Sequence, residues 1–324
     1  MKQVRPKKNL GQHFLTDLGI AKAIADTVDA CPDLPVLEVG PGMGVMTQYL
    51  VEKPRELKVV EIDRESVAYL KQTLFRGYEG TKVRRCENGY EGQDLASGNL
   101  EPSHPRTPES PIIEGDFLRM DLDKVFGGRP FVLTGNYPYD ISSQIFFKML
   151  DNKELIPCCT GMIQREVAQR MASEPGTKAY GILSVLIQAW YRVEYLFTVD
   201  EHVFNPPPKV KSAVIRMTRN DVTDLGCDER LFRRVVKTVF GQRRKMLRVS
   251  LRQLVNRECE GTKVQGCENG SSAEGNLAPS PPRTPAPPES KGGFFDLPMM
   301  TRRPEQLTIQ EFIELTNKVA EQLQ

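Results

Sequence analysis

Short apolar runs alternate with amphipathic segments over the first two thirds of this 324-residue chain. Runs rich in Val, Ile and Leu are typical of buried strands, and the longer segments between them repeat their apolar positions with a helical period. Strands are expected at 36–39, 57–62, 112–113, 131–133 and 160–163, and helices near 17–28, 44–53, 64–75 and 141–150. This alternation predicts an α/β fold in which helices cover both faces of a parallel sheet.

The pattern changes toward the C-terminus. Two further apolar runs, 193–199 and 210–217, can extend the sheet, but from about residue 225 the apolar positions recur with a helical period. Helices are expected there at 231–240, 243–254 and 305–323. We therefore expect an α/β domain over residues 1–220 and a small all-helical domain over residues 225–324.

Two related segments interrupt this pattern. One contains EGTKVRRCENG and lies near 77–111, and the other contains EGTKVQGCENG and lies near 259–292. Both are rich in Gly, Pro, Ser and Glu, a composition that cannot bury enough surface to offset the entropy of ordering. They are expected to be flexible insertions without a part in the chemistry. A pair of docking tails is the alternative.

Composition narrows the class of protein. The chain has 44 Lys and Arg against 42 Asp and Glu, so its overall charge favours no particular partner. Seven cysteines without a C-x-x-C spacing fit neither a disulfide framework nor a metal site, and they indicate a reducing compartment. The N-terminus lacks the apolar stretch of a signal peptide, and no apolar run is long enough to span a membrane. We expect a cytoplasmic protein that binds neither membrane nor metal.

A glycine-rich turn follows the first strand. Residues 38–44 read EVGPGMG, where the strand ends and a helix begins. Glycines in such a turn let a ligand approach backbone N–H groups, so Gly40 and Gly42 are candidate cofactor contacts. The G-x-G-x-G spacing departs from the G-x-G-x-x-G pattern of nicotinamide sites, and an ordinary tight turn is the alternative.

Acidic residues follow the next two strands. Glu61 lies 21 residues after Gly40, the usual place of an acceptor for ribose hydroxyls, although it could be a solvated strand-end acid. Asp116 can accept from an adenine amino group while Phe117 packs beside the base. Because the strand ends of a parallel sheet meet at one edge, these residues predict a pocket for an adenosine without a pyrophosphate.

The fourth strand ends in TGNYPYD, residues 134–140. An adenine amine is a weak nucleophile, because its lone pair is delocalised into the ring, and a catalyst must hold its N–H groups with acceptors. The side-chain oxygen of Asn136 can accept one N–H, a backbone carbonyl of Tyr137 or Pro138 can accept the other, and Tyr139 can stack on the base. The alternative is that Asn136 caps the next helix and the tyrosines fill the core.

Seven motifs stand in a fixed order along the chain: NLGQHFL (9–15), EVGPGMG (38–44), VVEID (59–63), EGDF (114–117), GNYPY (135–139), FNPPPKVKSAV (204–214) and QRRK (242–245). With this series the chain resembles the KsgA-type rRNA adenine N6,N6-dimethyltransferases over nearly all of its length outside the two insertions. The resemblance implies a Rossmann-like class I methyltransferase fold and S-adenosyl-L-methionine as methyl donor. Matched residue by residue, it adds His13 and Leu15 to the cofactor contacts, together with Asn136.

The resemblance also implies a substrate, namely two adjacent adenines near the 3′ end of small-subunit (16S) rRNA. The partner would be an assembling 30S subunit, and we expect a monomeric enzyme. The chain departs from the family pattern at His13 and Asp140, where many relatives have Asn, and at Tyr137, where many have Leu. Met246 and Val249 replace the usual Thr and Asn among the expected RNA contacts.

Two groups of basic residues are candidate RNA contacts. The first stands at the start of the helical domain and consists of Arg243, Arg244, Lys245 and Arg248. A cationic helix face of this kind binds phosphates or is merely solvated. The second group, expected to be a mobile arm over cofactor and RNA, consists of Arg5, Lys7 and Lys8. Phe204 can stack on the target base opposite Tyr139, or it can pack beneath the prolines that follow it.

Two other functions share parts of this pattern. A large-subunit rRNA adenine N6-methyltransferase of the antibiotic-resistance type would have the same pocket and turn, but the basic helical domain and the PPPKVKSAV run favour the small-subunit enzyme. A non-catalytic ribosome-assembly factor could keep the fold and the RNA surface. The presence of Asn136, Pro138 and Tyr139 together argues against that factor.

Overall fold

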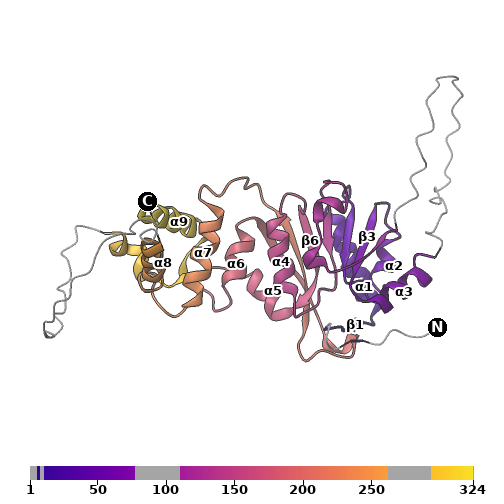
Figure 1. Ribbon diagram of the computed structural model, residues 1–324. Helices are drawn as coiled ribbons and strands as arrows, with labels where there is room; N and C mark the ends of the chain where they lie inside the picture. The colour runs from indigo at the N-terminus through magenta and orange to yellow at the C-terminus, as the bar shows by residue number, and fades with distance from the viewer. Residues whose placement is uncertain (1–5, 8–10, 77–109, 262–292, 324) are drawn as a thin grey trace, which may run out of the picture. The chain divides into compact units, whose positions relative to one another are not determined.

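The computed structural model describes residues 6–7, 11–76, 110–261 and 293–323. Within them the chain forms two compact units, which are treated separately below (Figure 1). The first unit combines the residues up to 168 with 193–219, and the second combines 169–192 with the residues from 220 onward.

The division differs in one respect from the predicted domain boundary at residue 220. Segment 169–192 groups with the helical unit, although it precedes two strands of the sheet. Both predicted insertions, near 77–111 and 259–292, lie almost entirely outside the described residues, so their flexibility and dispensability stay predictions.

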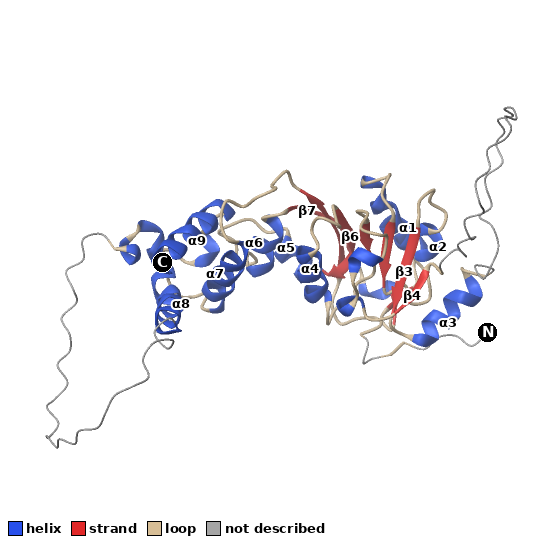
Figure 2. Ribbon diagram, turned by 45° about the horizontal axis from the view of Figure 1, so that its top comes forward, coloured by secondary structure: helices blue, strands red, loops and turns tan. Residues whose placement is uncertain are grey.

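A seven-stranded sheet dominates the first unit, with strand order β4-β3-β2-β5-β6-β9-β7 (Figure 2). The strands are β2 (Val36–Val39), β3 (Leu57–Glu61), β4 (Ile112–Glu114), β5 (Val132–Thr134), β6 (Cys158–Gln164), β7 (Tyr191–Val199) and β9 (Ser212–Arg219). The strands from β4 to β6 run parallel, and β9 pairs antiparallel with β6. The chain order reverses between β2 and β5, which is where open α/β sheets bind ligands.

Helices cover both faces of this sheet, as predicted. They are α1 (Leu18–Asp26), α2 (Thr47–Leu50), α3 (Arg64–Thr73), α4 (Ser142–Asp151) and α5 (Arg165–Met171), with 3₁₀ turns η2 (Thr27–Ala30), η3 (Phe117–Arg119), η4 (Leu122–Lys124) and η5 (Glu201–Val203). Ile24 of α1 shares a buried cluster with Cys158 of β6. The next residue of the strand, Cys159, must point to the opposite face. There it meets Tyr137, whose ring packs against Phe146 of α4 at a centroid distance of 5.6 Å.

The second unit is helical. It contains α6 (Ile182–Gln188), α7 (Glu229–Gly241), α8 (Leu247–Gly261) and α9 (Ile309–Leu323), with 3₁₀ turns η6 (Phe294–Asp296), η7 (Pro298–Thr301) and η8 (Pro304–Gln306). Its centre includes the ring of Phe240, which packs against Tyr180 at 6.3 Å and Phe312 at 5.9 Å. Along the described part of the chain, no helix is both long enough and apolar enough to cross a membrane.

Several element ends differ from the prediction for local reasons. The helix expected at 44–53 shortens to α2, because Gly44 has a φ of +74° and cannot continue an α-helical turn. The last helix begins at Ile309 rather than 305. Thr308 and Glu311 exchange side-chain and backbone hydrogen bonds there and cap the first turn.

Two helices, α5 and α6, and two short strands, β1 and β8, were not predicted. Helix α6 reads ILSVLIQ, a nearly continuous apolar run whose period does not separate helix from strand. Strands β1 (Phe14–Leu15) and β8 (Phe204–Asn205) have two residues each and form a separate antiparallel ribbon. This ribbon joins the N-terminal segment to the segment before β9, and no short-range signal marks a pairing over so long a separation.

Gly161 lets β6 lie close to the backbone of Gly135, in the turn after β5. It has a φ of +140°, and a Cβ atom there would lie 2.3 Å from the carbonyl oxygen of Gly135. The next residue, Met162, donates its N–H to Gly135 at 2.9 Å and accepts from the N–H of Tyr137 at 3.0 Å. A side chain at 161 would therefore push β6 away from the turn that follows β5.

We expect Gly161→Ala to lower the free energy of unfolding by about 1–3 kcal/mol more than Gly127→Ala, since a backbone carbonyl cannot move aside cheaply. Gly127 is the matched control, because its φ is +63° but nothing lies within 4 Å of an added Cβ. Urea denaturation of the two variants measures the difference. Equal losses would show that the contact with Gly135 does not constrain the sheet.

Candidate active site

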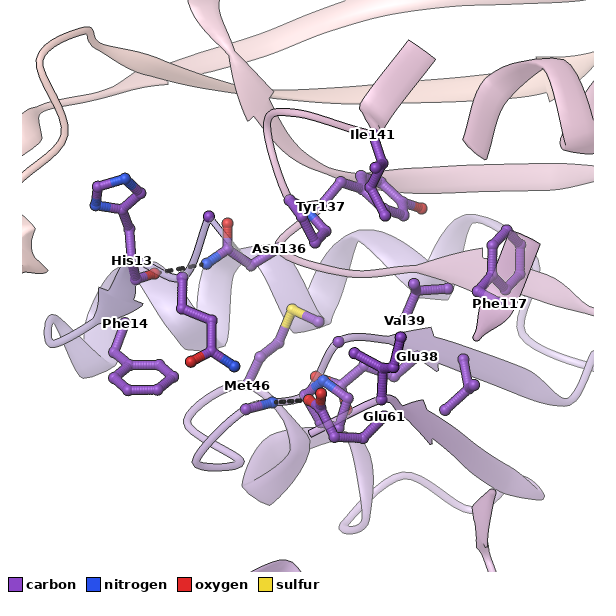
Figure 3. Close-up of a pocket in the computed structure, with 18 of the residues that line it drawn as sticks. His13, Phe14, Glu38, Val39, Met46, Glu61, Phe117, Asn136, Tyr137 and Ile141 are labelled. Atoms are coloured by element: carbon purple, nitrogen blue, oxygen red, sulfur yellow. Dashed lines mark hydrogen bonds between the residues drawn. The ribbon is translucent and has the colours of Figure 1, made fainter. Parts of the chain in front are cut away.

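The carboxyl ends of β2, β3 and β5 and the turn after β4 line a single pocket of about 270 Å³ (Figure 3). The N-terminal segment 11–15 forms another wall. The structure thus brings together the residues predicted to bind cofactor or amine, which are His13, Leu15, Gly40, Gly42, Glu61, Asp116, Asn136, Tyr137, Pro138 and Tyr139. Their individual roles stay predictions.

The glycine turn and Glu61 hold each other. Gly40 and Gly42 have φ angles of +66° and +55°, which glycine adopts without strain. The N–H of Gly42 donates to Oε2 of Glu61 at 3.0 Å, and the N–H of Asp63 donates to Oε1 at 2.9 Å. Burial raises the pKa of Glu61 despite these bonds. A carboxylate oxygen can accept more than one hydrogen bond, so Glu61 can also accept from a ribose hydroxyl.

Glu38 is a pocket residue to which the sequence analysis gave no role. Its side chain is 1% exposed, and Oε2 has no hydrogen-bond partner among the described residues. Burial, together with repulsion from Glu61, raises the pKa of Glu38 to about 8. The signal in the sequence was an acid inside the otherwise apolar strand VLEV, which is rare unless the acid serves a function.

These features fit a nucleoside that carries a positive charge. A buried carboxyl such as Glu38 is stabilised in its ionised form by a nearby cation. Glu61 offers acceptors for hydroxyls, and the glycine turn leaves room for close approach to the backbone. The residues present therefore suit the ribose and the cationic amino-acid portion of S-adenosylmethionine.

The loop after β4 is held by a lysine of α4. Asp116 accepts from the N–H of Leu118 at 2.9 Å, and Phe117 is 4% exposed and lines the pocket. The ammonium of Lys148 donates to the carbonyls of Leu118 and Met120 and lies 5.7 Å from the centre of the Phe117 ring. Lys148 thereby fixes the residues predicted to contact adenine. No sequence spacing indicated it.

The turn after β5 presents the amide of Asn136 to the pocket. Asn136 continues the strand pairing through a bridge to Met162, and its Nδ2 donates to the carbonyl of His13 at 3.2 Å (Figure 3). Because a carbonyl can only accept, this bond uses the amide nitrogen and leaves Oδ1 as the acceptor. The alternative that Asn136 caps a helix is wrong, since the N-cap of α4 is Ile141.

The structure distinguishes between the backbone carbonyls of Tyr137 and Pro138, either of which could be the second acceptor on the evidence of the sequence alone. The carbonyl of Pro138 accepts from the N–H of Ile141 at 3.3 Å, as in an ordinary turn. The ring of Tyr137 is wholly buried, and its hydroxyl donates to the carbonyl of Thr160 at 2.8 Å. Tyr137 therefore fills the core with its side chain, and its backbone carbonyl is the better candidate for the second acceptor.

Two aromatic predictions have different outcomes. Tyr139 is half-buried and lines the pocket, so its ring can face a base. Phe204 is 3% exposed, pairs with Leu15 in the β1–β8 ribbon and belongs to a buried cluster. The ribbon thus buries the ring of Phe204 in this structure, and its stacking role stays a prediction.

The basic candidates also differ. Lys7 pairs with the buried carboxylate of Asp63 at 2.6 Å and with Glu65 at 3.4 Å, so its charge is already compensated. Although burial alone would raise the pKa of Asp63, hydrogen bonding with Lys7 holds that pKa below its ordinary value. Arg5 and Lys8 lie outside the described residues.

In the helical unit, Arg244, Lys245 and Arg248 are exposed, whereas Arg243 is half-buried. Arg243 donates to the carbonyl of Thr177 at 3.3 Å. Met246 and Val249 are 41% and 44% exposed and lie among these cations. Across the described ranges of both units, no cluster of His, Cys, Asp and Glu is suited to a metal ion.

Comparison with known proteins gives consistent matches. The family model described as ribosomal RNA adenine dimethylase matches residues 3–88 and 97–276. The chain is similar to proteins named ribosomal RNA small subunit methyltransferase A. That of Phocaeicola vulgatus is 56% identical, covering 98% of this chain and 90% of the relative. The protein of Bacteroides thetaiotaomicron is 55% identical, covering 100% of this chain and 97% of the relative. That of Flavobacterium johnsoniae is 43% identical, covering 98% of this chain and 97% of the relative.

Two solved structures share the fold. A dimethyladenosine transferase from Plasmodium falciparum has a TM-score of 0.66 at 21% identity, covering 96% of this chain and 98% of its own. The 23S rRNA methyltransferase ErmE has a TM-score of 0.55 at 22% identity, covering 95% of this chain and 99% of its own. Such likeness confirms the Rossmann-like fold and does not distinguish between substrates.

The buried Glu38 gives a pH-dependent prediction. Between its ordinary pKa of 4.5 and its raised pKa of about 8, the folded protein keeps a proton that the unfolded chain releases, so stability falls as pH rises. We expect Glu38→Gln to raise the melting temperature of the ligand-free protein, and to raise it more at pH 8 than at pH 5. Thermal denaturation at both pH values measures this, with the exposed Glu52→Gln as control. A gain that is the same at both values would contradict the raised pKa.

Proposed function

Because the chain belongs to the ribosomal RNA adenine dimethylase family, we propose that it transfers methyl groups from S-adenosylmethionine to N6 of two adjacent adenines near the 3′ end of small-subunit rRNA. Each adenine would receive two methyl groups during assembly of the 30S subunit. The observation that carries the proposal is the turn after β5, where Asn136 Oδ1 and the carbonyl of Tyr137 are left as acceptors beside the pocket.

The pocket residues position the methyl donor. S-Adenosylmethionine, when bound, supplies an electrophilic methyl group on a sulfonium sulfur. Glu61 accepts from the ribose, Asp116 and Phe117 contact the adenine, and Glu38 lies where a carboxylate can balance the ammonium. The buried Glu38 changes from its neutral to its charged form when it meets that cation, since an opposite charge favours ionisation.

The turn residues prepare the nucleophile. Asn136 Oδ1 and the Tyr137 carbonyl accept the two N–H groups of the target amine and orient its lone pair toward the incoming carbon. With the donor bound, the methyl carbon would pass from sulfur to N6, and the nitrogen would then release one proton to water. Pro138 stiffens the turn by fixing its own φ. Tyr139 stacks on a base that has left its helix, as an amine inside a stacked helix cannot be reached.

The second unit supplies the RNA contacts in this proposal. Arg244, Lys245 and Arg248 are exposed on or beside α8 and can bind phosphates, so binding should weaken steeply with salt. The exposed Met246 and Val249 would touch sugars or base faces between those contacts. We further propose that the enzyme acts as a monomer in the cytoplasm on a 30S assembly intermediate, with the first unit for methyl transfer and the second for rRNA binding.

The small-subunit substrate is favoured over the large-subunit one by the relatives at 43–56% identity, which are named as small-subunit enzymes. The likeness to ErmE extends to the fold alone. A non-catalytic assembly factor would not need Asn136 and Tyr137 held at the edge of a cofactor pocket.

The substrate assignment predicts a specific product. Purified protein, S-adenosylmethionine and unmethylated small subunits should yield N6,N6-dimethyladenine at two neighbouring positions near the rRNA 3′ end. Mass spectrometry of rRNA fragments measures this, with large subunits as the parallel substrate. Methylation of large-subunit RNA alone would refute the assignment.

The acceptor role of Asn136 predicts a separation of turnover from binding. Asn136→Ala should lower kcat by about 10²–10³-fold, the usual effect of removing one positioned polar group from a reacting centre. Affinity for S-adenosylmethionine, measured by calorimetry, should change much less. Asn152→Ala, at the other end of α4, is the control and should keep full activity. If the Asn136 variant turns over at a near-normal rate, the acceptor role is wrong.

A further inference from the structure

Two of the contacts of His13 are to the turn after β5, and a third is to the loop before β9. Its carbonyl accepts from Nδ2 of Asn136 at 3.2 Å. Its ring stacks on the ring of Tyr139, with the centroids 5.7 Å apart and the planes at 25°. Its Nδ1 lies 2.8 Å from the carbonyl oxygen of Pro206, so Nδ1 must carry a hydrogen and donate it. One residue therefore joins the acceptor amide, the base-stacking tyrosine and the loop before β9.

Tyr139 is held from two directions as a result. Its hydroxyl is hydrogen-bonded to the hydroxyl of Ser212 on β9, and the imidazole of His13 covers one face of its ring. The ring nevertheless remains half-buried and lines the pocket. Stacking on one face and a fixed hydroxyl leave one defined orientation of the ring for a base on the other face.

We propose that the side chain of His13 is a positioning residue for the target base, acting through Tyr139. This inference rests on the proposed function and refines the role that the resemblance gave to His13. The backbone of the same residue orients Asn136, so main chain and side chain of His13 serve the two halves of the amine site. The imidazole offers an aromatic face to Tyr139, which an amide side chain would not have.

A purely structural role for the imidazole is disfavoured by the anchors beside it. Phe14 and Leu15 pair with Asn205 and Phe204 in the β1–β8 ribbon. The N–H and hydroxyl of Thr16 both donate to the carbonyl of Val203, at 2.8 and 2.9 Å. The N-terminal segment therefore stays attached when the imidazole is removed, and a loss of activity would report on the ring itself.

Three variants separate the features of the imidazole. His13→Ala removes both the stack and the hydrogen bond to Pro206, His13→Asn removes the aromatic face but keeps a donor, and His13→Phe keeps the aromatic face but removes the donor. Thr16→Val is the matched control, because it removes a side-chain hydrogen bond from the same segment without touching Tyr139. For each variant, calorimetry gives the Kd of S-adenosylmethionine, and methylation of unmethylated small subunits gives kcat and KM.

We expect His13→Ala and His13→Asn to lower kcat about 10- to 100-fold, the range in which misplacement of a reacting group falls, while the cofactor Kd changes less than about twofold. His13→Phe should recover most of the activity, and Thr16→Val should match the wild type. A cofactor Kd that rises as steeply as kcat falls would assign His13 to the cofactor and overturn the proposal. A phenylalanine variant as poor as the alanine variant would overturn it as well.

A second readout does not depend on the reaction. In protein labelled with 3-fluorotyrosine, the fluorine resonance of Tyr139, assigned with Tyr139→Phe, should shift in His13→Ala and His13→Asn and stay near its wild-type position in Thr16→Val. An unchanged resonance in His13→Ala refutes the stack. Failure of the wild-type enzyme to methylate small subunits would refute the proposed function instead, and it is seen before any variant is compared.

Discussion

The active site depends on how closely β5 and β6 approach each other. Gly161 has no side chain to hold off the carbonyl of Gly135, so the two chain segments form a further bridge three residues beyond the last pair of the regular ladder. That bridge places Asn136 beside Met162 and directs the ring of Tyr137 into the core. The buried Tyr137, whose hydroxyl donates to the carbonyl of Thr160, then anchors the turn that lines the pocket. The position of the turn therefore depends on a steric condition: no side chain at residue 161 may separate β6 from the turn after β5.

Electrostatics give the same pocket its preference for a cationic ligand. Glu38 and Glu61 are both buried at the carboxyl edge of the sheet, and burial raises the pKa of each. Backbone N–H groups satisfy Glu61, whereas Glu38 keeps an oxygen without a partner among the described residues. An ordinary protein core would not retain such a group, because an apolar residue of similar size would be more stable. A bound cation would offset this loss of stability, because it favours the ionised form of Glu38.

The sequence predicted the sheet, the helices on its two faces and the place of the pocket, because these follow from apolar periodicity and from residues at strand ends. It did not indicate which aromatic rings remain accessible. Phe204 and Tyr139 look alike in sequence, yet a two-residue ribbon buries the first and leaves the second at the pocket. Lys7 resembled a phosphate-binding residue until the structure showed Asp63 beside it. Exposure and pairing are decided by contacts between distant segments, which no local pattern contains.

The β1–β8 ribbon has a consequence for how the enzyme is made. Segment 11–15 leaves the ribosome about 190 residues before its partner strand, Phe204–Asn205. Closing so long a loop is slow and comes late in folding. The central strands can pair during synthesis, whereas the wall of the pocket that contains His13 waits until β8 has emerged. A nascent chain can therefore pair the parallel strands from β2 to β6 before it can enclose its methyl donor.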